Sequence, residues 1–153
     1  GLVTARNTHA LADGGSAVLL AEAGWASARG LKPLATVAAT AYAAVPPERM
    51  GVASVPAVRA ALAKAGWTAK QVDLWEVNET FAAQLLLDAR ELRLDLARVN
   101  VNGGSIALGH PFAASGARLL LGLALELRRR GLRRGVAAVC VGGGLGVAAA
   151  LEC

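Results

Sequence analysis

The residues VAAVCVGGGLGVAAAL, at positions 136–151, decide the fold of this chain. Two apolar runs, Val136–Val141 and Gly146–Leu151, are joined by the glycines at 142–144. Short apolar runs joined by glycines favour an antiparallel β-hairpin, because glycine readily adopts the positive φ angles of tight turns. We therefore expect a hairpin that closes a sheet.

A very apolar helix is expected directly before this hairpin, at residues 116–130. Its leucines surround nearly the whole helical circumference, so we expect the helix to be buried on most sides. They are Leu119, Leu120, Leu121, Leu123, Leu125 and Leu127. Five arginines at 128–130 and 133–134 flank Gly131, where this helix is expected to end. There they favour the negative end of the helix dipole and stay solvated, with a phosphate contact as the alternative.

Further strands and helices are expected upstream. Ser54 and Asn78 can each cap a helix, and Gly66 can end the first of these helices. The expected strands cover 17–21, 34–42, 72–77, 99–102, 136–141 and 146–151. From residue 34 onward the order is β-α-β-α-β-α-β-β, which indicates a layered α/β fold with a mixed sheet and a buried central helix. The strand and helix within 17–30 have no partner sheet of their own.

Composition excludes several classes of protein. The chain has 153 residues, of which 55% are hydrophobic and 18% charged, so disorder is excluded. The net charge of +5 comes mostly from the arginine cluster, which lacks the interleaved aromatics of a nucleic-acid site. The apolar stretches are shorter than the roughly 20 residues that span a bilayer, so we expect no membrane segment. Cys140 and Cys153 form neither a disulfide framework nor a metal-ligand pattern, which favours a reducing, cytoplasmic setting.

Three loops place polar groups or glycines at the ends of expected strands, where open α/β sheets form their sites. They begin at Asn78, Gly103 and Cys140, and the second of them contains His110. Each loop has a plain structural explanation as well. Asn78 can be a helix cap, Cys140 a small buried hydrophobe, His110 a structural histidine, and the glycines turn formers.

Taken together, the three loops resemble the thiolase family. The resemblance rests on Asn-Glu-Thr-Phe-Ala at 78–82, Asn-Val-Asn-Gly-Gly-Ser-Ile-Ala-Leu-Gly-His-Pro at 100–111 and Cys-Val-Gly-Gly-Gly at 140–144. The opening Thr-Ala-Arg-Asn-Thr-His and Ala-Ser-Gly-Ala-Arg at 114–118 extend it over essentially the whole chain. It implies a thiolase-like layered fold, in which residues 1–31 are the last strand and helix of an N-terminal domain and residues 32–153 are the C-terminal domain.

The resemblance also implies an activity. Thiolases cleave a 3-ketoacyl-CoA with CoA, or condense two acyl-CoA molecules, through an acyl-cysteine. His110 would activate the nucleophilic thiol and donate to a thioester oxygen, and Cys140 would be the acid/base thiol at the α-carbon. Asn78 would hold a water of the first oxyanion site, and the backbone N–H of Gly142 would serve the second. The acyl-CoA is substrate, and no separate cofactor or metal is implied.

Four further residues match positions that contact substrate. Met50 and Phe81 match walls of the pantetheine channel, although either could be plain core. His9 stands where the family usually has a CoA-contacting Ser, and Phe112 begins Phe-Ala where Ile-Gly or Met-Gly is usual. Arg6 in place of Gly and Thr80 in place of Ala are the other departures. They bear on CoA geometry and acyl-chain preference.

The family's acyl-accepting cysteine and its CoA-binding loop domain both precede the matched region. We therefore expect this chain to be inactive alone, and to need an N-terminal half or a second chain. An exposed apolar face would also favour a homo-oligomer. A catalytically inactive binding or assembly module is the alternative, favoured by Arg6 and His9. A ketosynthase-type condensing enzyme shares the fold, but usually places His or Asn where Cys140 stands.

Overall fold

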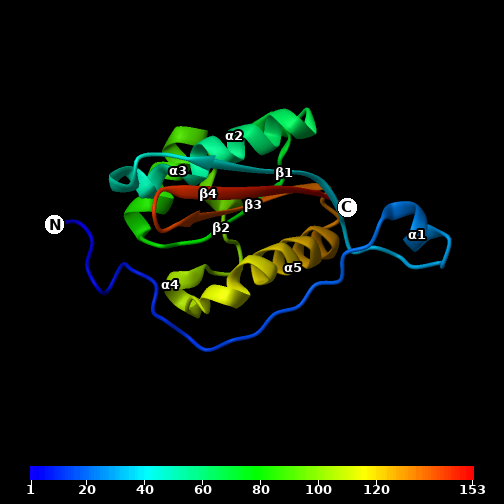
Figure 1. Ribbon diagram of the computed structural model, residues 1–153, viewed down its shortest axis with the longest axis horizontal. Coiled ribbons are helices and arrows are strands. Elements are labelled where there is room, and N and C mark those ends of the chain that lie inside the picture. Colours follow the sequence, from blue (N-terminus) through cyan, green and yellow to red (C-terminus); the bar gives the residue numbers. More distant parts are fainter.

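A computed structural model describes residues 1–153, and its centre is one four-stranded sheet (Figure 1). The strands lie in the order β1 (Thr36–Ala44), β4 (Leu145–Glu152), β3 (Arg134–Val141) and β2 (Leu74–Val77). β2 runs parallel to β3, whereas β4 runs antiparallel to both of its neighbours, β1 and β3. The sheet is therefore mixed, and β3 and β4 form the expected hairpin.

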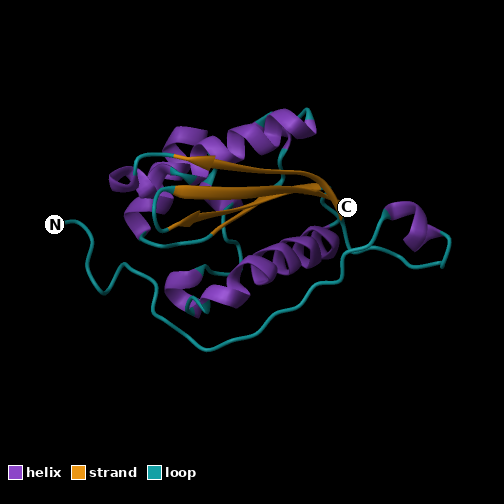
Figure 2. Ribbon diagram, in the orientation of Figure 1, coloured by secondary structure: helices purple, strands orange, loops and turns teal.

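Helices cover both faces of the sheet (Figures 1 and 2). On one face lie α2 (Ser54–Ala65) and α3 (Ala82–Leu92), and on the other lies the long helix α5 (Phe112–Arg130) with the single turn α4 (Ser105–Leu108) before it. Three 3₁₀ turns complete the connections: Pro47–Val52, Ala69–Gln71 and Leu96–Arg98. α2 and α5 end at Gly66 and Gly131 in the left-handed conformation, as the sequence predicts.

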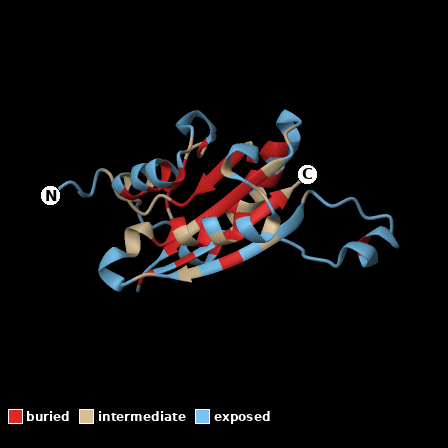
Figure 3. Ribbon diagram, turned by 90° about the horizontal axis from the view of Figure 1, so that it is seen from above, coloured by how far each residue is buried: buried red, intermediate tan, exposed pale blue.

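Each face of the sheet has its own core. Successive side chains of a strand point to opposite faces, so Trp75 packs toward α2 while its neighbour Leu74 packs toward α5. The core on the α2 face contains 15 buried residues, and the core on the α5 face contains 7. Figure 3 shows buried residues concentrated in the central strands and in the helix faces against them, whereas the edge strand β1 is mostly exposed.

The glycines of the hairpin allow close backbone packing. A Cβ on Gly146 would lie 1.9 Å from the carbonyl oxygen of Ala53, and one on Gly144 would lie 2.2 Å from that of Val45. Gly144 also has a φ of +86°, and its own carbonyl accepts a hydrogen bond from the Val45 N–H at 2.8 Å. The hairpin thus fixes the segment between β1 and α2, and only glycine fits at these two positions.

The N-terminal arm, residues 1–22, corrects one expectation. The strand expected at 17–21 is absent, and the arm instead runs as an extended segment along α5 to the short helix α1 (Ala23–Ser27) (Figure 1). Leu19 and Leu20 are exposed by 89% and 75%. A strand needs a neighbour to receive its backbone hydrogen bonds, and no strand of the sheet lies beside this segment.

The strand expected at 99–102 is also absent. Asn100 has a φ of +47°, which ends any extended run, and only Val99 forms a single bridge to Trp75. The Asn100 side chain takes over the pairing with β2. Its carboxamide oxygen accepts from the Val77 N–H at 2.8 Å, and its NH₂ donates to the Val77 carbonyl at 2.9 Å.

The predictions that Ser54 and Asn78 cap helices were wrong. Ser54 lies inside α2, and its hydroxyl donates to the buried Asp88 carboxylate at 2.6 Å. Asn78 precedes α3 by several residues, and Phe81 occupies the N-cap position without a side-chain hydrogen bond. Burial explains both changes, because each side chain has a partner in the interior that is distant in sequence.

The long helix α5 is buried on one side only. Leu119, Leu123 and Leu127 face the sheet and are at most 2% exposed, whereas Leu125 on the outer side is 49% exposed. The prediction that this helix is buried on most sides was therefore wrong for this chain by itself. No layer of these 153 residues covers the outer side of α5.

The arginine cluster at the end of α5 is largely solvated, as expected. Arg129 and Arg130 pair with Glu126, and the two arginines at 133 and 134 pair with Glu152. Arg128 donates to the carbonyl of Pro33 at 3.0 Å. These contacts support the helix-end interpretation of the positive charge.

Candidate active site

Asn78 lies at the carboxyl end of β2, and its orientation is fixed by buried partners. Its backbone N–H continues the pairing with β3 by donating to the Ala138 carbonyl at 2.9 Å. The Ser105 hydroxyl donates to the Asn78 carboxamide oxygen at 2.6 Å, and Arg118 donates to that hydroxyl at 3.1 Å. Because the oxygen of Asn78 is engaged, its NH₂ faces the other way, 3.5 Å from Nε2 of His110.

The loop between Asn78 and α4 is held by a carboxylate. Glu79 accepts from the Asn100 carboxamide and from the Ile106 backbone N–H, both at 2.9 Å. A Cβ on Gly104 would lie 2.1 Å from the Glu79 carboxyl carbon, so this approach requires glycine. These contacts keep Ser105 beside Asn78, a connection that local sequence patterns do not reveal.

His110 lies between α4 and α5 with its tautomer defined. Its Nδ1 is 2.6 Å from the Ser115 hydroxyl, which in turn donates to the Pro111 carbonyl at 3.0 Å. Since the hydroxyl hydrogen is used there, Nδ1 carries the imidazole hydrogen and Nε2 carries the lone pair. Burial lowers the pKa of His110, and the neighbouring His9 and Arg118 lower it further. The site therefore holds a neutral imidazole whose basic nitrogen faces Asn78.

Two aromatic rings pack against His110. The His9 ring lies 4.5 Å from it between centroids and the Phe112 ring 4.8 Å, both edge-on. The N-terminal arm delivers His9, because Thr8 forms a bridge with Phe81 and the His9 N–H donates to the Thr80 carbonyl at 3.5 Å. Phe112 is 68% exposed, so it lies at the rim of the site.

Cys140 lies near the end of β3, one strand away from Asn78. Its thiol is buried, and Sγ is 3.2 Å from the Thr80 hydroxyl. Burial raises the pKa of the Cys140 thiol, while the Thr80 hydrogen bond partly opposes the increase. The group is therefore a protonated thiol at neutral pH, which suits a proton donor.

The remaining candidates lie around these groups. Gly142 is at the exposed tip of the hairpin, and no atom lies within 4 Å of the place where its Cβ would be. Met50 is half-buried in the turn Pro47–Val52, and Phe81 is half-buried at the start of α3. Contacts thus join Asn78 and His110 directly. Cys140 connects to them through the 78–81 loop, while neither Met50 nor Gly142 forms a hydrogen bond with this group.

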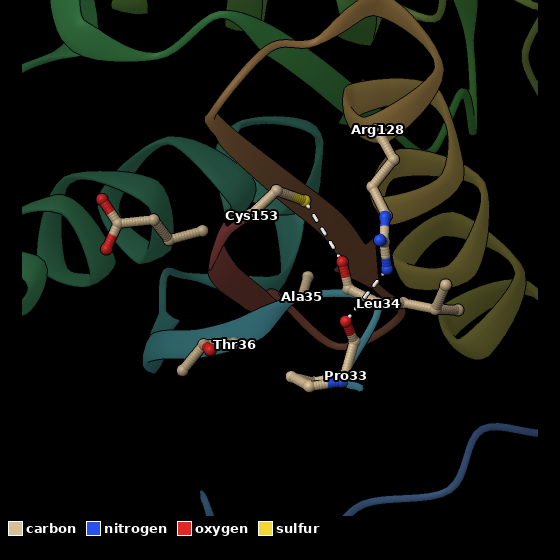
Figure 4. Close-up of a pocket in the computed structure, with 7 residues that line it drawn as sticks. Pro33, Leu34, Ala35, Thr36, Arg128 and Cys153 are labelled. Carbon is tan, nitrogen blue, oxygen red and sulfur yellow. Dashed lines mark hydrogen bonds between the residues drawn. The ribbon is translucent and has the colours of Figure 1, made fainter. Parts of the chain in front are cut away.

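Two hollows lie outside this group. A groove of about 640 Å³ separates the N-terminal arm from α5, and its walls include Leu108, Leu121 and Leu125. A smaller pocket of about 180 Å³ lies at the other end of α5, where the Cys153 thiol faces the Leu34 carbonyl at 3.4 Å (Figure 4). Cys153 is thus remote from His110. None of the helices is both long and apolar enough to cross a membrane.

Comparison with known proteins identifies the family. Residues 31–153 match the family model described as thiolase, C-terminal domain. The chain belongs to the thiolase family. An acetyl-CoA acetyltransferase of Pseudomonas aeruginosa is 55% identical over 99% of the chain, and this region is 38% of that relative. The chain thus spans well under half the length of the relatives it matches.

Solved thiolase structures share the fold. The Bacillus anthracis acetyl-CoA acetyltransferase superposes with a TM-score of 0.95 at 46% identity, over 98% of this chain and 38% of that one. The human mitochondrial 3-ketoacyl-CoA thiolase, solved in complex with CoA, gives 0.91 at 41% identity with the same coverages. The expected thiolase-like α/β fold is confirmed. The names of relatives include cytosolic and mitochondrial enzymes, so the cytoplasmic location stays a prediction.

Proposed function

We propose that this chain is the C-terminal half of a thiolase that transfers acyl groups between CoA thioesters. The observation that carries the proposal is the pairing of a neutral His110 with an oriented Asn78, next to a loop that contacts a buried thiol. The nucleophilic cysteine would come from the part of the relatives that this chain does not cover. Residues 1–31 would then belong to the preceding domain and residues 32–153 to the C-terminal one.

In thiolysis, the nucleophilic cysteine would give its proton to Nε2 of His110 and attack the 3-keto carbonyl. Cleavage of the carbon–carbon bond leaves an electron pair at the α-carbon, which takes the proton of the Cys140 thiol. The resulting thiolate then accepts the proton of the incoming CoA thiol, and the CoA sulfur attacks the acyl-cysteine. The nucleophilic cysteine leaves as a thiolate and would recover its proton from His110. A high pKa keeps Cys140 protonated until the α-carbon needs the proton.

Two oxyanions develop in this sequence and need hydrogen-bond donors. The protonated His110, together with a water held by the Asn78 NH₂, would stabilise the enolate oxygen of the departing thioester. The backbone N–H of Gly142 would serve the tetrahedral intermediate, and the open space beside Gly142 supports this assignment. His9, Phe81, Phe112 and Met50 would line the approach of the pantetheine arm.

The chain would need a second half both for chemistry and for packing. The groove beside α5 is lined by leucines, and Leu125 is 49% exposed there. An apolar groove of this kind favours a partner layer, either the N-terminal half or another copy in a homo-oligomer. We expect the isolated chain to be inactive.

Reconstitution tests this function. The chain is mixed with the N-terminal part of the Pseudomonas aeruginosa relative, and acetoacetyl-CoA thiolysis is measured. His110→Ala and Cys140→Ala are each expected to lower kcat by about 10²- to 10⁴-fold, because each removes a proton-transfer group. Cys153→Ser is the matched control and should leave kcat unchanged. A stable complex without activity, or full activity in His110→Ala, would contradict the proposal.

One observation favours a binding or assembly module as a second candidate. The His9 ring lies against His110 at 4.5 Å, on the side from which the arm reaches the site. Calorimetric titration of the lone chain with CoA separates the two functions. Clear binding by the lone chain supports a module, whereas binding only after addition of the N-terminal half supports the incomplete enzyme.

A further inference from the structure

A buried chain of polar side chains leads from α2 to Cys140. Ser54 and Gln84 both donate to Oδ2 of Asp88, and the carboxamide oxygen of Gln84 accepts from the Thr80 backbone N–H at 3.0 Å. Thr80 then contacts the Cys140 thiol with its hydroxyl at 3.2 Å. Ser54, Gln84 and Asp88 are each at most 3% exposed, so solvent does not compete for these bonds.

The geometry points to Thr80 as a positioning residue for the Cys140 thiol, with Gln84 and Asp88 as its support. The inference rests on the proposed function only in giving that thiol an acid/base role. The contact itself stands on the hydrogen bonds just described.

The Thr80 hydroxyl suits both forms of the thiol. It can accept a hydrogen bond from S–H and donate one to the thiolate, so it remains a partner throughout a proton-transfer cycle. A β-branched side chain has few χ1 rotamers, and Gln84 fixes the Thr80 backbone. The hydroxyl therefore stays directed at Sγ instead of rotating toward solvent.

Asp88 and Thr80 act on the thiol in opposite directions. Burial is the main cause of the raised pKa of Cys140, the Thr80 hydrogen bond lowers this pKa, and the negative charge of Asp88 raises it. Asp88 is itself buried, with a pKa raised to about 6 by desolvation, and its Oδ1 has no partner. Above that pH the ionised Asp88 helps to keep Cys140 protonated.

Thr80 and Asp88 shift the pKa of Cys140 in opposite directions. Removing each of them should therefore give opposite results, which a general loosening of the structure would not produce. The 153-residue chain carrying Cys153→Ser has Cys140 as its only thiol. Cysteine is labelled with ¹³C at Cβ, and the ionisation midpoint of Cys140 is followed by NMR while circular dichroism monitors folding. This measurement needs no catalysis, so its result is independent of the thiolysis assay.

Three variants decide the outcome. Thr80→Val keeps the shape and removes the hydroxyl, and should raise the midpoint by about one pH unit. Thr80→Ser keeps the hydroxyl and should leave the midpoint near that of the parent, while Asp88→Asn should lower it. An unchanged midpoint in Thr80→Val, or equal shifts in Thr80→Val and Thr80→Ser, overturns the inference. The comparison of Thr80→Val with Thr80→Ser, at a half-buried position, decides the question even if Asp88→Asn does not fold.

Discussion

The two faces of the sheet differ in completeness. On one face, α2 and α3 close a core of 15 buried residues within the chain. On the other face, α5 buries one side against a core of 7 residues and leaves its outer side beside a groove. The first layer can be stable by itself, whereas the second would be half of an interface under the proposed function. The candidate active site lies between them, at the carboxyl end of β2, and depends on both.

Leucines on the two sides of α5 give the largest expected contrast. Leu127 is fully buried against the sheet, and Leu125, two residues earlier, is 49% exposed. Leu127→Ala should lower the free energy of unfolding by about 2–5 kcal/mol, because it leaves a cavity in a packed core. Leu125→Ala should lower it by less than about 1 kcal/mol. Urea unfolding of the two variants measures both values.

The N-terminal half reverses this contrast if it covers α5. Leu125→Ala should then weaken association of the halves by about tenfold, although it hardly changes the stability of the lone chain. Calorimetric titration of one half into the other measures the affinity. Equal destabilisation by both alanine variants in the lone chain would show that the outer side of α5 is already packed.

A buried carboxyl on each face provides the next comparison. Glu76 lies on the α5 face, and desolvation raises its pKa from 4.5 to about 7 against the opposing charge of Arg118. A raised pKa in the folded state means that protonation stabilises the fold. Stability linked to Glu76 is thus fully present below about pH 4.5 and is lost as the pH rises toward 7.

Glu76→Gln should remove this loss. At pH 8 the variant should be more stable than the parent by on the order of 2 kcal/mol, and at pH 4 the two should agree within about 0.5 kcal/mol. Urea unfolding at a series of pH values measures the difference. The stability of the variant should still fall between about pH 4 and 6, because Asp88 on the other face has a pKa of about 6. Parallel stability curves for variant and parent would refute the assignment.

Local patterns in the sequence predicted the hairpin and helix ends on both faces of the sheet. The hairpin, the mixed sheet and the helix ends at Gly66 and Gly131 follow from short-range physics, namely apolar runs, glycine turns and left-handed caps. The strand expected at 99–102 failed because Asn100 pairs with Val77 through its side chain instead of its backbone. This replacement of backbone pairing by side-chain pairing depends on a partner 23 residues away in the sequence, and local patterns do not record such a partner.

The candidate site divides in the same way. The motif resemblance located Asn78, His110 and Cys140, and the structure places Asn78 and His110 in contact. The residues that orient them were not singled out, because Ser105 and Ser115 are ordinary loop and helix residues in the sequence. Their hydroxyls become specific only when α4 and α5 bring them to 2.6 Å from their partners. The catalytic roles themselves stay predictions.

The smallest expected effect concerns the N-terminal arm, which borders the open side of α5. The Ser16 hydroxyl donates to the Ala114 carbonyl and ties the arm to the start of that helix. Ser16→Ala should change the free energy of global unfolding by less than about 0.5 kcal/mol, because the arm buries little surface. The arm should nevertheless detach from α5 more often, since one hydrogen bond is worth about 1 kcal/mol. Protease cleavage within residues 1–22 should therefore become about fivefold faster.

Ser27→Ala in α1 is the matched control, because the Ser27 side chain makes no hydrogen bond to the rest of the fold. Mass spectrometry of a limited digest locates the cuts and gives their rates. If the N-terminal half covers the groove, its addition should slow cleavage in parent and Ser16→Ala alike, because the arm is then held between two layers. Cleavage of the arm at parental rate in Ser16→Ala would mean that the bridges of Thr8 to Phe81 and of Leu11 to His110 hold the arm without the Ser16 hydrogen bond. The arm would then depend on the candidate site, and not on α5, for its position.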